Sequence, residues 1–132
     1  MRLADREQKL VARYAIITDR HERLNAIVSH RVTDSEIPKE ERCDEWLVKG
    51  CASHVWLRVQ NDSERLHISY GADSQLVRGL VALLVELFQG AALDDAREFS
   101  PQILELLELD QMLSPTRLHG LRCLLEKLRY VD

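Results

Sequence analysis

The chain has 132 residues, 45% of them hydrophobic and 30% charged, so it can bury one hydrophobic core and is too apolar to be disordered. Its 18 Lys and Arg against 22 Asp and Glu exclude the basic excess typical of nucleic-acid-binding domains. The longest apolar run, residues 80–85, is much shorter than the roughly 20 residues of a membrane span, and the N-terminus has no apolar signal region. We therefore expect one cytoplasmic domain over residues 1–132, with no membrane segment.

The N-terminal third of the chain is expected to be helical. Apolar residues recur at helical spacing over residues 10–17. Asp19 followed by Glu22 resembles a capping box, which predicts a second helix. Residues 33–42 are mostly polar and contain Pro38, so this stretch is expected to be a loop, because the residue before proline avoids the helical region.

The middle of the chain changes to an alternating period. Residues 54–60 alternate between more and less apolar side chains, and residues 66–70 alternate again, which predicts two strands. The turn residues 61–64 between them indicate a hairpin. Residues 46–48 form a short third candidate strand.

The last half of the chain is again expected to be helical. Residues 75–89 form the most apolar helix, capped by Asp73 or Ser74, and a helix with only a narrow polar stripe belongs at the centre, packed on the sheet. Ser100-Pro101 and Ser114-Pro115 predict two more helix starts. The order of elements predicts an α+β domain with a small three-stranded antiparallel sheet, covered by helices on one side.

Cys51 is the strongest candidate for a chemical role. The chain has three cysteines and no export signal, which favours free thiols over a disulfide framework. Cys51 follows Gly50 in the connection that enters a strand, where a thiol can reach the thiol of another protein. Lys49 or His54 nearby could favour the thiolate that sulfur exchange requires. The alternative interpretation is a small buried apolar residue.

Arg117 and Trp56 each have two possible interpretations, whereas Cys123 is given no role. Arg117 lies on the inward edge of the last helix, where it needs either a structural partner or a bound anion. Trp56 lies on the more polar face of its strand and could pack over the cysteine loop, or belong to the core. Cys123 falls opposite the leucine stripe of the last helix, so we expect it to face away from the core and assign it no role.

A metal site and a thiol protease are both poorly supported. Cys43, Cys51 and His54 lack the two tight ligand pairs typical of structural zinc, and no histidine or asparagine is visibly placed to orient a catalytic base. Cys43 could resolve a persulfide or pair with Cys51 under oxidation, or be incidental.

Three segments together resemble the SufE/CsdE family of sulfur acceptors. They occur in the family's order and span most of the chain. The first is similar to the Gly-Cys-x-Ser-x-Val-Trp signature, the second to the capped central helix, and the third to Leu-Ser/Thr-Pro-x-Arg-x-x-Gly-Leu. In this chain they read Val48-Lys49-Gly50-Cys51-Ala52-Ser53-His54-Val55-Trp56-Leu57, then Ala72-Asp73-Ser74 with Val77-Arg78-Gly79-Leu80, then Leu113-Ser114-Pro115-Thr116-Arg117 with Gly120-Leu121.

The resemblance implies a small α+β domain similar to the IscU-type scaffold. It implies that Cys51 accepts persulfide sulfur from a PLP-dependent cysteine desulfurase of the SufS or CsdA kind, stimulates that enzyme, and delivers sulfur to an iron–sulfur scaffold complex. The cofactor belongs to the desulfurase, so none is expected here. Supporting roles are expected for Gly50, Ser53, His54, Trp56, Asp73 and Arg117. Departures from the family pattern at Ala52, His54 and Asp73 leave the partner desulfurase open, and the sequence also leaves open a homodimer.

Two other functions stay open. An IscU-type scaffold shares the expected fold, but it needs three cysteines that converge on one cluster, and Cys123 is expected to be badly placed for that. A regulator could also bind a desulfurase without accepting sulfur.

Overall fold

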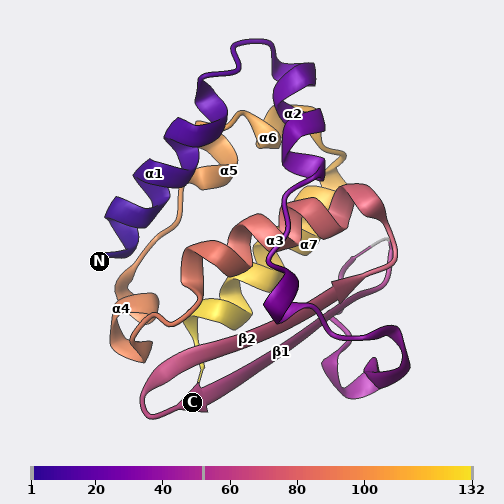
Figure 1. Cartoon of the computed structure of the whole chain (residues 1–132), viewed down its shortest axis with the longest axis vertical. Helices are drawn as coiled ribbons and strands as arrows, with labels where there is room; N and C mark the ends of the chain where they lie inside the picture. The colour runs from indigo at the N-terminus through magenta and orange to yellow at the C-terminus, as the bar shows by residue number, and fades with distance from the viewer. Residues whose placement is uncertain (1, 52, 132) are drawn as a thin grey trace.

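A computed structural model describes residues 2–51 and 53–131 of the chain. Figure 1 shows the long hairpin β1–β2 on one side of the molecule, α3 and α7 crossing its middle, and α1 and α2 on the far side of α3. Three 3₁₀ turns (η1–η3) connect α2 to β1. In chain order the elements are α1 (Leu3–Ala15), α2 (Arg20–Val28), η1 (Thr33–Ser35), η2 (Lys39–Glu41), η3 (Asp44–Trp46), β1 (Val55–Asp62), β2 (Arg65–Ala72), α3 (Gln75–Phe88), α4 (Leu93–Glu98), α5 (Ile103–Leu106), α6 (Leu109–Met112) and α7 (Pro115–Arg129).

The two N-terminal helices form as predicted. Asp19 caps α2, because its Oδ1 accepts hydrogen bonds from the backbone N–H groups of His21 at 2.9 Å and Glu22 at 3.1 Å. The first helix ends at Ala15, two residues before the end of the apolar pattern that predicted it.

The predicted hairpin is confirmed and is longer than expected. The two strands pair antiparallel from Val55–Ala72 to Asp62–Arg65. Ser63 and Glu64 form the turn with φ of 53° and 70°. Two consecutive left-handed residues match the right-handed twist of the strands on either side, so pairing continues to the turn.

The predicted third strand is wrong. Residues 44–46 form η3, and only an isolated antiparallel bridge joins Leu47 to Trp56. The backbone N–H of Val48 donates to the carbonyl of Val55 at 2.8 Å. The acidic 3₁₀ turn on one side and Gly50, with φ of 91°, on the other leave too few extended residues for a strand. Among the described residues, the sheet therefore has two strands.

The central position of α3 is confirmed. Ser74 caps it, with Oγ accepting from the N–H of Val77 at 3.4 Å, and nearly its whole circumference is buried. Gly79 lets α2 approach closely, since a β-carbon there would lie 2.5 Å from the carbonyl oxygen of Ile27. The helix packs on β2 and contacts α1, α2 and α7, so it links all the layers of the fold.

Only one of the two serine–proline helix starts is correct. Ser114 caps α7, with Oγ accepting from the N–H of Arg117 at 3.3 Å. The other predicted helix begins later, at Ile103, because the Glu7 carboxylate of α1 accepts a hydrogen bond from the N–H of Gln102 at 2.7 Å. A side chain from a distant helix thus fixes where α5 starts. The sequence patterns did not predict α4.

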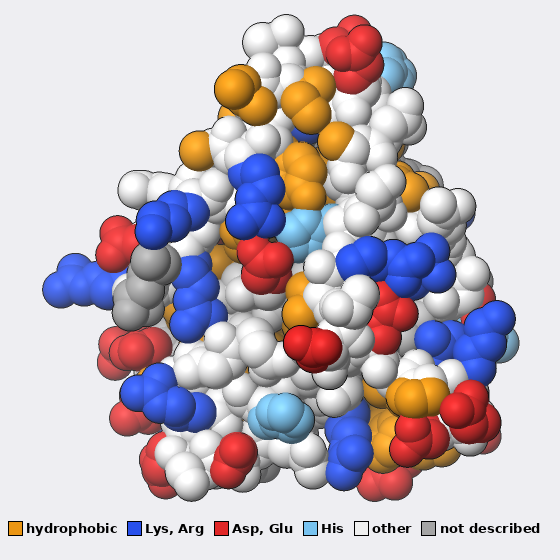
Figure 2. Space-filling model, viewed as in Figure 1, with side chains coloured by type: hydrophobic (Ala, Val, Ile, Leu, Met, Phe, Trp, Pro, Cys, Tyr) orange, Lys and Arg blue, Asp and Glu red, His pale blue; other side chains and the backbone are white. Residues whose placement is uncertain are grey.

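The surface is charged and mixed in sign. Figure 2 shows Lys and Arg side chains interspersed with Asp and Glu over one face of the molecule. In the described part of the chain, no helix has the length and apolar character needed to cross a bilayer.

The candidate site around Cys51

Cys51 lies in a short loop between the Leu47–Trp56 bridge and β1. The hydrogen bond from Val48 to Val55 closes the base of this loop, which we call the Cys51 loop (residues 49–54, described except for residue 52). Gly50 has φ of 91°, a left-handed conformation that favours glycine. Cys51 is half-buried and packs against the hydrophobic core. The loop therefore presents its thiol inward at rest.

Helix α7 lies directly against the Cys51 loop at Gly120. A β-carbon at position 120 would lie 2.7 Å from Cys51 Sγ and 3.2 Å from the carbonyl oxygen of Gly50. Any larger residue would push the loop away. Gly120 belongs to the third segment that resembles the family, and no role was expected for it from the sequence, although a glycine inside a helix is itself a signal of close packing.

A small, mostly apolar cavity lies beside the Cys51 thiol. Its volume is about 10 Å³, close to the least that one water molecule needs. Arg117 is the charged residue of its wall, and its Nη1 is buried with no hydrogen-bond partner among the described residues. An unpaired buried guanidinium nitrogen is a strong, unsatisfied donor. The cavity is lined by Cys51, Ser53, Val55, Val77, Leu80, Val81, Arg117, Leu121 and Leu124.

The surroundings of Cys51 favour the neutral thiol. Burial raises the pKa of the Cys51 thiol, and the nearby Cys123 raises it further. The expectation that Lys49 or His54 would favour the thiolate is wrong for this conformation, because desolvation dominates and His54 is paired with another residue. A raised pKa keeps the resting thiol protonated and poorly nucleophilic.

His54, Asp73 and Trp56 form the outer side of the Cys51 loop. His54 Nδ1 lies 3.1 Å from Asp73 Oδ2, and the backbone N–H of Asp73 donates to the carbonyl of His54 at 3.0 Å. The centroid of the Trp56 ring lies 5.8 Å from the centroid of the His54 ring and 5.1 Å from the Arg42 guanidinium carbon. These three predicted residues therefore anchor the loop where it joins the hairpin.

Cys123 lies on the side of α7 opposite its leucines, as expected, and is absent from the hydrophobic core, but on that side it contacts the Cys51 loop, so it is not without neighbours. Cys123 is half-buried, and its Sγ lies 3.5 Å from the position a β-carbon would take at Gly50. His119 Nε2 lies 3.5 Å from the same sulfur. The Cys51 loop covers this side of α7, opposite the leucines, which a helical period alone cannot reveal.

The third cysteine, Cys43, is exposed. Within residues 2–51 and 53–131, no group of three or more His, Cys, Asp or Glu side chains is arranged to hold a metal ion.

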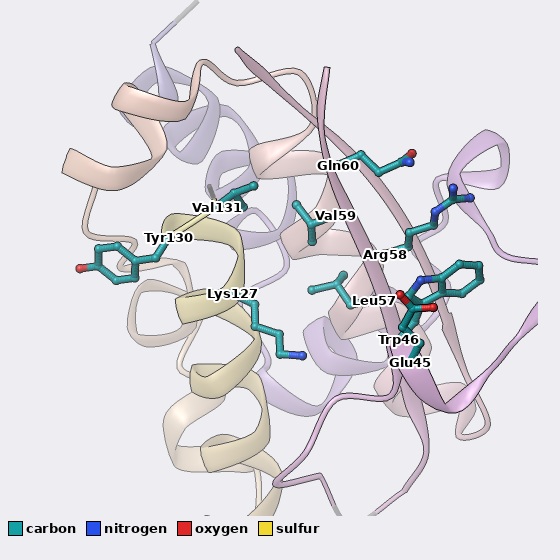
Figure 3. Close-up of a pocket in the computed structure, with 9 residues that line it drawn as sticks. All are labelled: Glu45, Trp46, Leu57, Arg58, Val59, Gln60, Lys127, Tyr130 and Val131. Atoms are coloured by element: carbon teal, nitrogen blue, oxygen red, sulfur yellow. The ribbon is translucent and has the colours of Figure 1, made fainter. Parts of the chain in front are cut away.

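A larger hollow lies between β1 and the C-terminal end of α7, away from Cys51. Its volume is about 580 Å³. Figure 3 shows Leu57 and Val59 on the strand, Lys127 and Val131 on the α7 side, and Arg58 beside Trp46 on the outer side of β1. The Arg58 guanidinium carbon is 4.9 Å from the Trp46 ring. The described residues that line this hollow include no cysteine, so Cys51 remains the candidate for sulfur chemistry.

Comparison with known proteins points to one family. Residues 8–131 match the model of the SufE family, described as an Fe-S metabolism associated domain. The chain is 40% identical over 84 residues to SufE-like protein 1, chloroplastic/mitochondrial, of Arabidopsis thaliana, a match covering 62% of this chain and 22% of that protein. It is 30% identical over 131 residues to the uncharacterized SufE-like protein RHE_CH01250 of Rhizobium etli, covering 92% of this chain and 85% of that protein.

A solved structure shares the fold. The solution structure of a hypothetical protein from Thermus thermophilus superposes with a TM-score of 0.73 and 15% sequence identity, covering 94% of this chain and 90% of that chain. At this identity the likeness concerns the arrangement of elements alone.

Proposed function

Since this chain belongs to the SufE family, we propose that it is a sulfur acceptor for iron–sulfur metabolism and that Cys51 carries the sulfur. In this proposal Cys51 takes sulfane sulfur from the persulfide of a PLP-dependent cysteine desulfurase, which frees the desulfurase for another turnover. The sulfur then passes to an iron–sulfur scaffold complex. PLP belongs to the desulfurase.

The observation that carries the proposal is the setting of Cys51. Its thiol sits on a glycine-bounded loop, half-buried against α7, beside a cavity lined in part by Arg117, whose Nη1 has no hydrogen-bond partner among the described residues. A sulfur carrier needs a thiol that is sheltered between transfers and can be presented to a partner. A loop that rests on Gly120 without a side chain to lock it meets both needs.

The transfer step is a thiol exchange. The Cys51 thiolate attacks the outer sulfur of the desulfurase persulfide, the bond between the two desulfurase sulfurs breaks, and the desulfurase cysteine leaves as a thiolate. Cys51 becomes the persulfide. Because burial raises the Cys51 pKa, the thiolate forms once the loop leaves Gly120 and the sulfur meets solvent or the partner. Docking of the desulfurase is the event that we propose moves the loop.

We expect Arg117 to stabilise the sulfur-loaded chain once the Cys51 loop has moved back against α7. A persulfide is more acidic than a thiol, and its terminal sulfur extends beyond Cys51 Sγ. In the cavity beside Cys51, the unpaired guanidinium nitrogen can donate to that anionic sulfur. The anion thereby supplies the partner that Arg117 lacks in the unloaded chain.

The decisive experiment follows sulfur from L-cysteine through a purified SufS- or CsdA-type desulfurase to this chain. We expect intact-mass spectrometry to show the mass of one added sulfur on Cys51, together with faster desulfurase turnover. Cys51→Ser should abolish both effects, while Cys43→Ser, at an exposed cysteine, should preserve them. Full stimulation by Cys51→Ser would refute the proposal and favour a regulator that accepts no sulfur.

A scaffold function is separated by anaerobic reconstitution with iron and sulfide. A carrier should show no stable cluster absorbance after desalting, whereas a scaffold of the IscU type would retain it.

A further inference from the structure

Helix α7 presents two residues one turn apart to the Cys51 loop. Gly120 lies under Cys51, and Cys123 lies beside Gly50, with its Sγ 3.5 Å from the position of a β-carbon there. Cys123 is close enough to contribute to the charge environment of Cys51. The fold thus gathers two thiols that are far apart in the sequence on one side of a single helix.

His119 completes this cluster. Its Nε2 lies 3.5 Å from Cys123 Sγ and 3.6 Å from the position of a β-carbon at Gly50. In the tautomer with an unprotonated Nε2, the imidazole can accept the Cys123 thiol proton. A histidine within reach of a thiol can take the thiol proton as the sulfur attacks. Cys51 has no such neighbour among the residues that shift its pKa.

Resting on the function proposed above, we propose that Cys123 is a resolving thiol for the Cys51 persulfide. His119 takes the proton of Cys123, and the Cys123 thiolate attacks Cys51 Sγ. A bond forms between the Cys123 and Cys51 sulfurs, and the bond from Cys51 Sγ to the outer sulfur breaks. The outer sulfur leaves with the electron pair as hydrosulfide. The sulfane sulfur is reduced and the two cysteines are oxidised to a disulfide, so no outside oxidant is needed.

The geometry favours this internal reaction over attack by outside thiols. The loaded Cys51 is sheltered against α7, whereas Cys123 already lies within the same cluster. Holding two reacting groups together raises their effective concentration by orders of magnitude. A loaded chain that meets no acceptor would therefore release its sulfur as hydrosulfide and stop in a disulfide state, which a thiol reductant reverses.

The test loads the chain anaerobically with inorganic polysulfide (sodium tetrasulfide), which needs no desulfurase. The starting protein carries Cys43→Ser, so that only Cys51 and Cys123 remain. After rapid desalting, we expect about one hydrosulfide released per loaded chain, with non-reducing peptide mapping that shows a Cys51–Cys123 disulfide. With Cys123→Ser or Cys123→Ala added, the persulfide should last on the order of tenfold longer or more, with no disulfide.

His119→Gln gives a second readout. It should slow hydrosulfide release, while the same disulfide still forms. Arg122→Gln, at an exposed neighbour on α7, is the matched control.

The inference is overturned if the persulfide lasts equally long with and without Cys123, or if hydrosulfide appears without the Cys51–Cys123 disulfide. These outcomes are distinct from failure of the proposed function. If the proposed function failed but this inference held, Cys123→Ser protein would gain no sulfur from a desulfurase. Polysulfide loading of the starting protein would still release hydrosulfide and form the Cys51–Cys123 disulfide.

Discussion

The Cys51 thiol occupies the space that a side chain at position 120 would fill, and Gly120 leaves that space free. A β-carbon at position 120 would come within 2.7 Å of Cys51 Sγ and 3.2 Å of Cys51 Cα, both closer than ordinary contact. The loop and the helix are therefore matched to each other at one point. This contact sets how deeply the thiol is buried, and so how readily it reacts.

Gly120→Ala should expose Cys51. The added methyl group cannot share space with Cys51 Sγ, so the loop must move away from α7, even though alanine is the better helix former by about 1 kcal/mol. We expect faster alkylation of Cys51 by iodoacetamide, measured by peptide mass spectrometry, while circular dichroism remains that of a folded protein. Thr116→Ala, at an exposed position of the same helix, is the control. An unchanged alkylation rate would mean that Gly120 does not govern exposure.

The reactivity of Cys51 should depend on pH with a raised midpoint. Burial and Cys123 raise the pKa of this thiol, and only the thiolate reacts. The rate of alkylation should therefore rise at higher pH in the folded chain than in an unstructured peptide with the sequence of residues 48–54. Peptide mass spectrometry of Cys51 after timed iodoacetamide treatment at each pH gives both profiles. A midpoint at or below that of the peptide would contradict the sheltered thiol.

Arg117→Gln should weaken sulfur acceptance without unfolding the chain. Arg117 Nη1 has no hydrogen-bond partner in the described part of the chain, so removing this nitrogen breaks no hydrogen bond that it makes there in the unloaded protein. A hydrogen bond from a charged group contributes about 1.5–3 kcal/mol, which corresponds to a loss on the order of tenfold to a hundredfold in the rate of Cys51 persulfide formation. Single-turnover mass spectrometry measures this rate. Wild-type rates in Arg117→Gln would remove Arg117 from the mechanism.

His30 should make the fold lose stability in acid. It is buried, with Nδ1 bonded to the Tyr14 hydroxyl and Nε2 3.0 Å from Glu86 Oε1, and burial lowers its pKa despite the opposing effect of Glu86. A lowered pKa means that the unfolded chain takes up the proton first. The free energy of unfolding should thus be highest above the ordinary histidine pKa of about 6.5 and fall as pH drops below it.

Urea unfolding from about pH 7.5 to about pH 5.5 tests this on either side of the histidine pKa. His30→Gln should flatten the slope, whereas His67→Gln, at an exposed histidine, should leave it unchanged. Equal slopes in wild type and His30→Gln would contradict the assignment.

Gln89→Ala should destabilise the edge of β2. The Gln89 side chain accepts from the N–H of Ile68 at 2.8 Å and donates to the carbonyl of Ile68 at 2.9 Å, as a neighbouring strand would. Losing it leaves backbone groups unpaired, at a cost of about 1–3 kcal/mol. Urea unfolding with Gln75→Ala, exposed at the other end of α3, as the control measures the difference. Equal stability of the two variants would mean that water replaces the amide at little cost.

The elements that the sequence predicted well are those fixed by neighbours along the chain. The hairpin, the caps at Asp19 and Ser114 and the apolar helix after Ser74 all follow from residues a few positions apart, because turn and cap hydrogen bonds are local. The prediction of a third strand was wrong because a strand needs several consecutive extended residues, and Gly50 interrupts them. The predicted start of α5 was wrong because the carboxylate that caps this helix comes from Glu7, far away in the sequence.

For the site, the order of residues predicts Cys51 rather than the other cysteines, because Cys51 follows a glycine, precedes a strand and lies in a segment that resembles a family signature; its role stays a prediction. What surrounds that thiol depends on the packing of the folded chain. Gly120, His119 and Cys123 reach the loop because α7 folds back across it, and the depth of that packing raises the Cys51 pKa. Desolvation and contact depend on atoms that the fold brings together from distant parts of the chain. A periodic pattern along one helix predicts which side faces the core, but not which segment covers the opposite side.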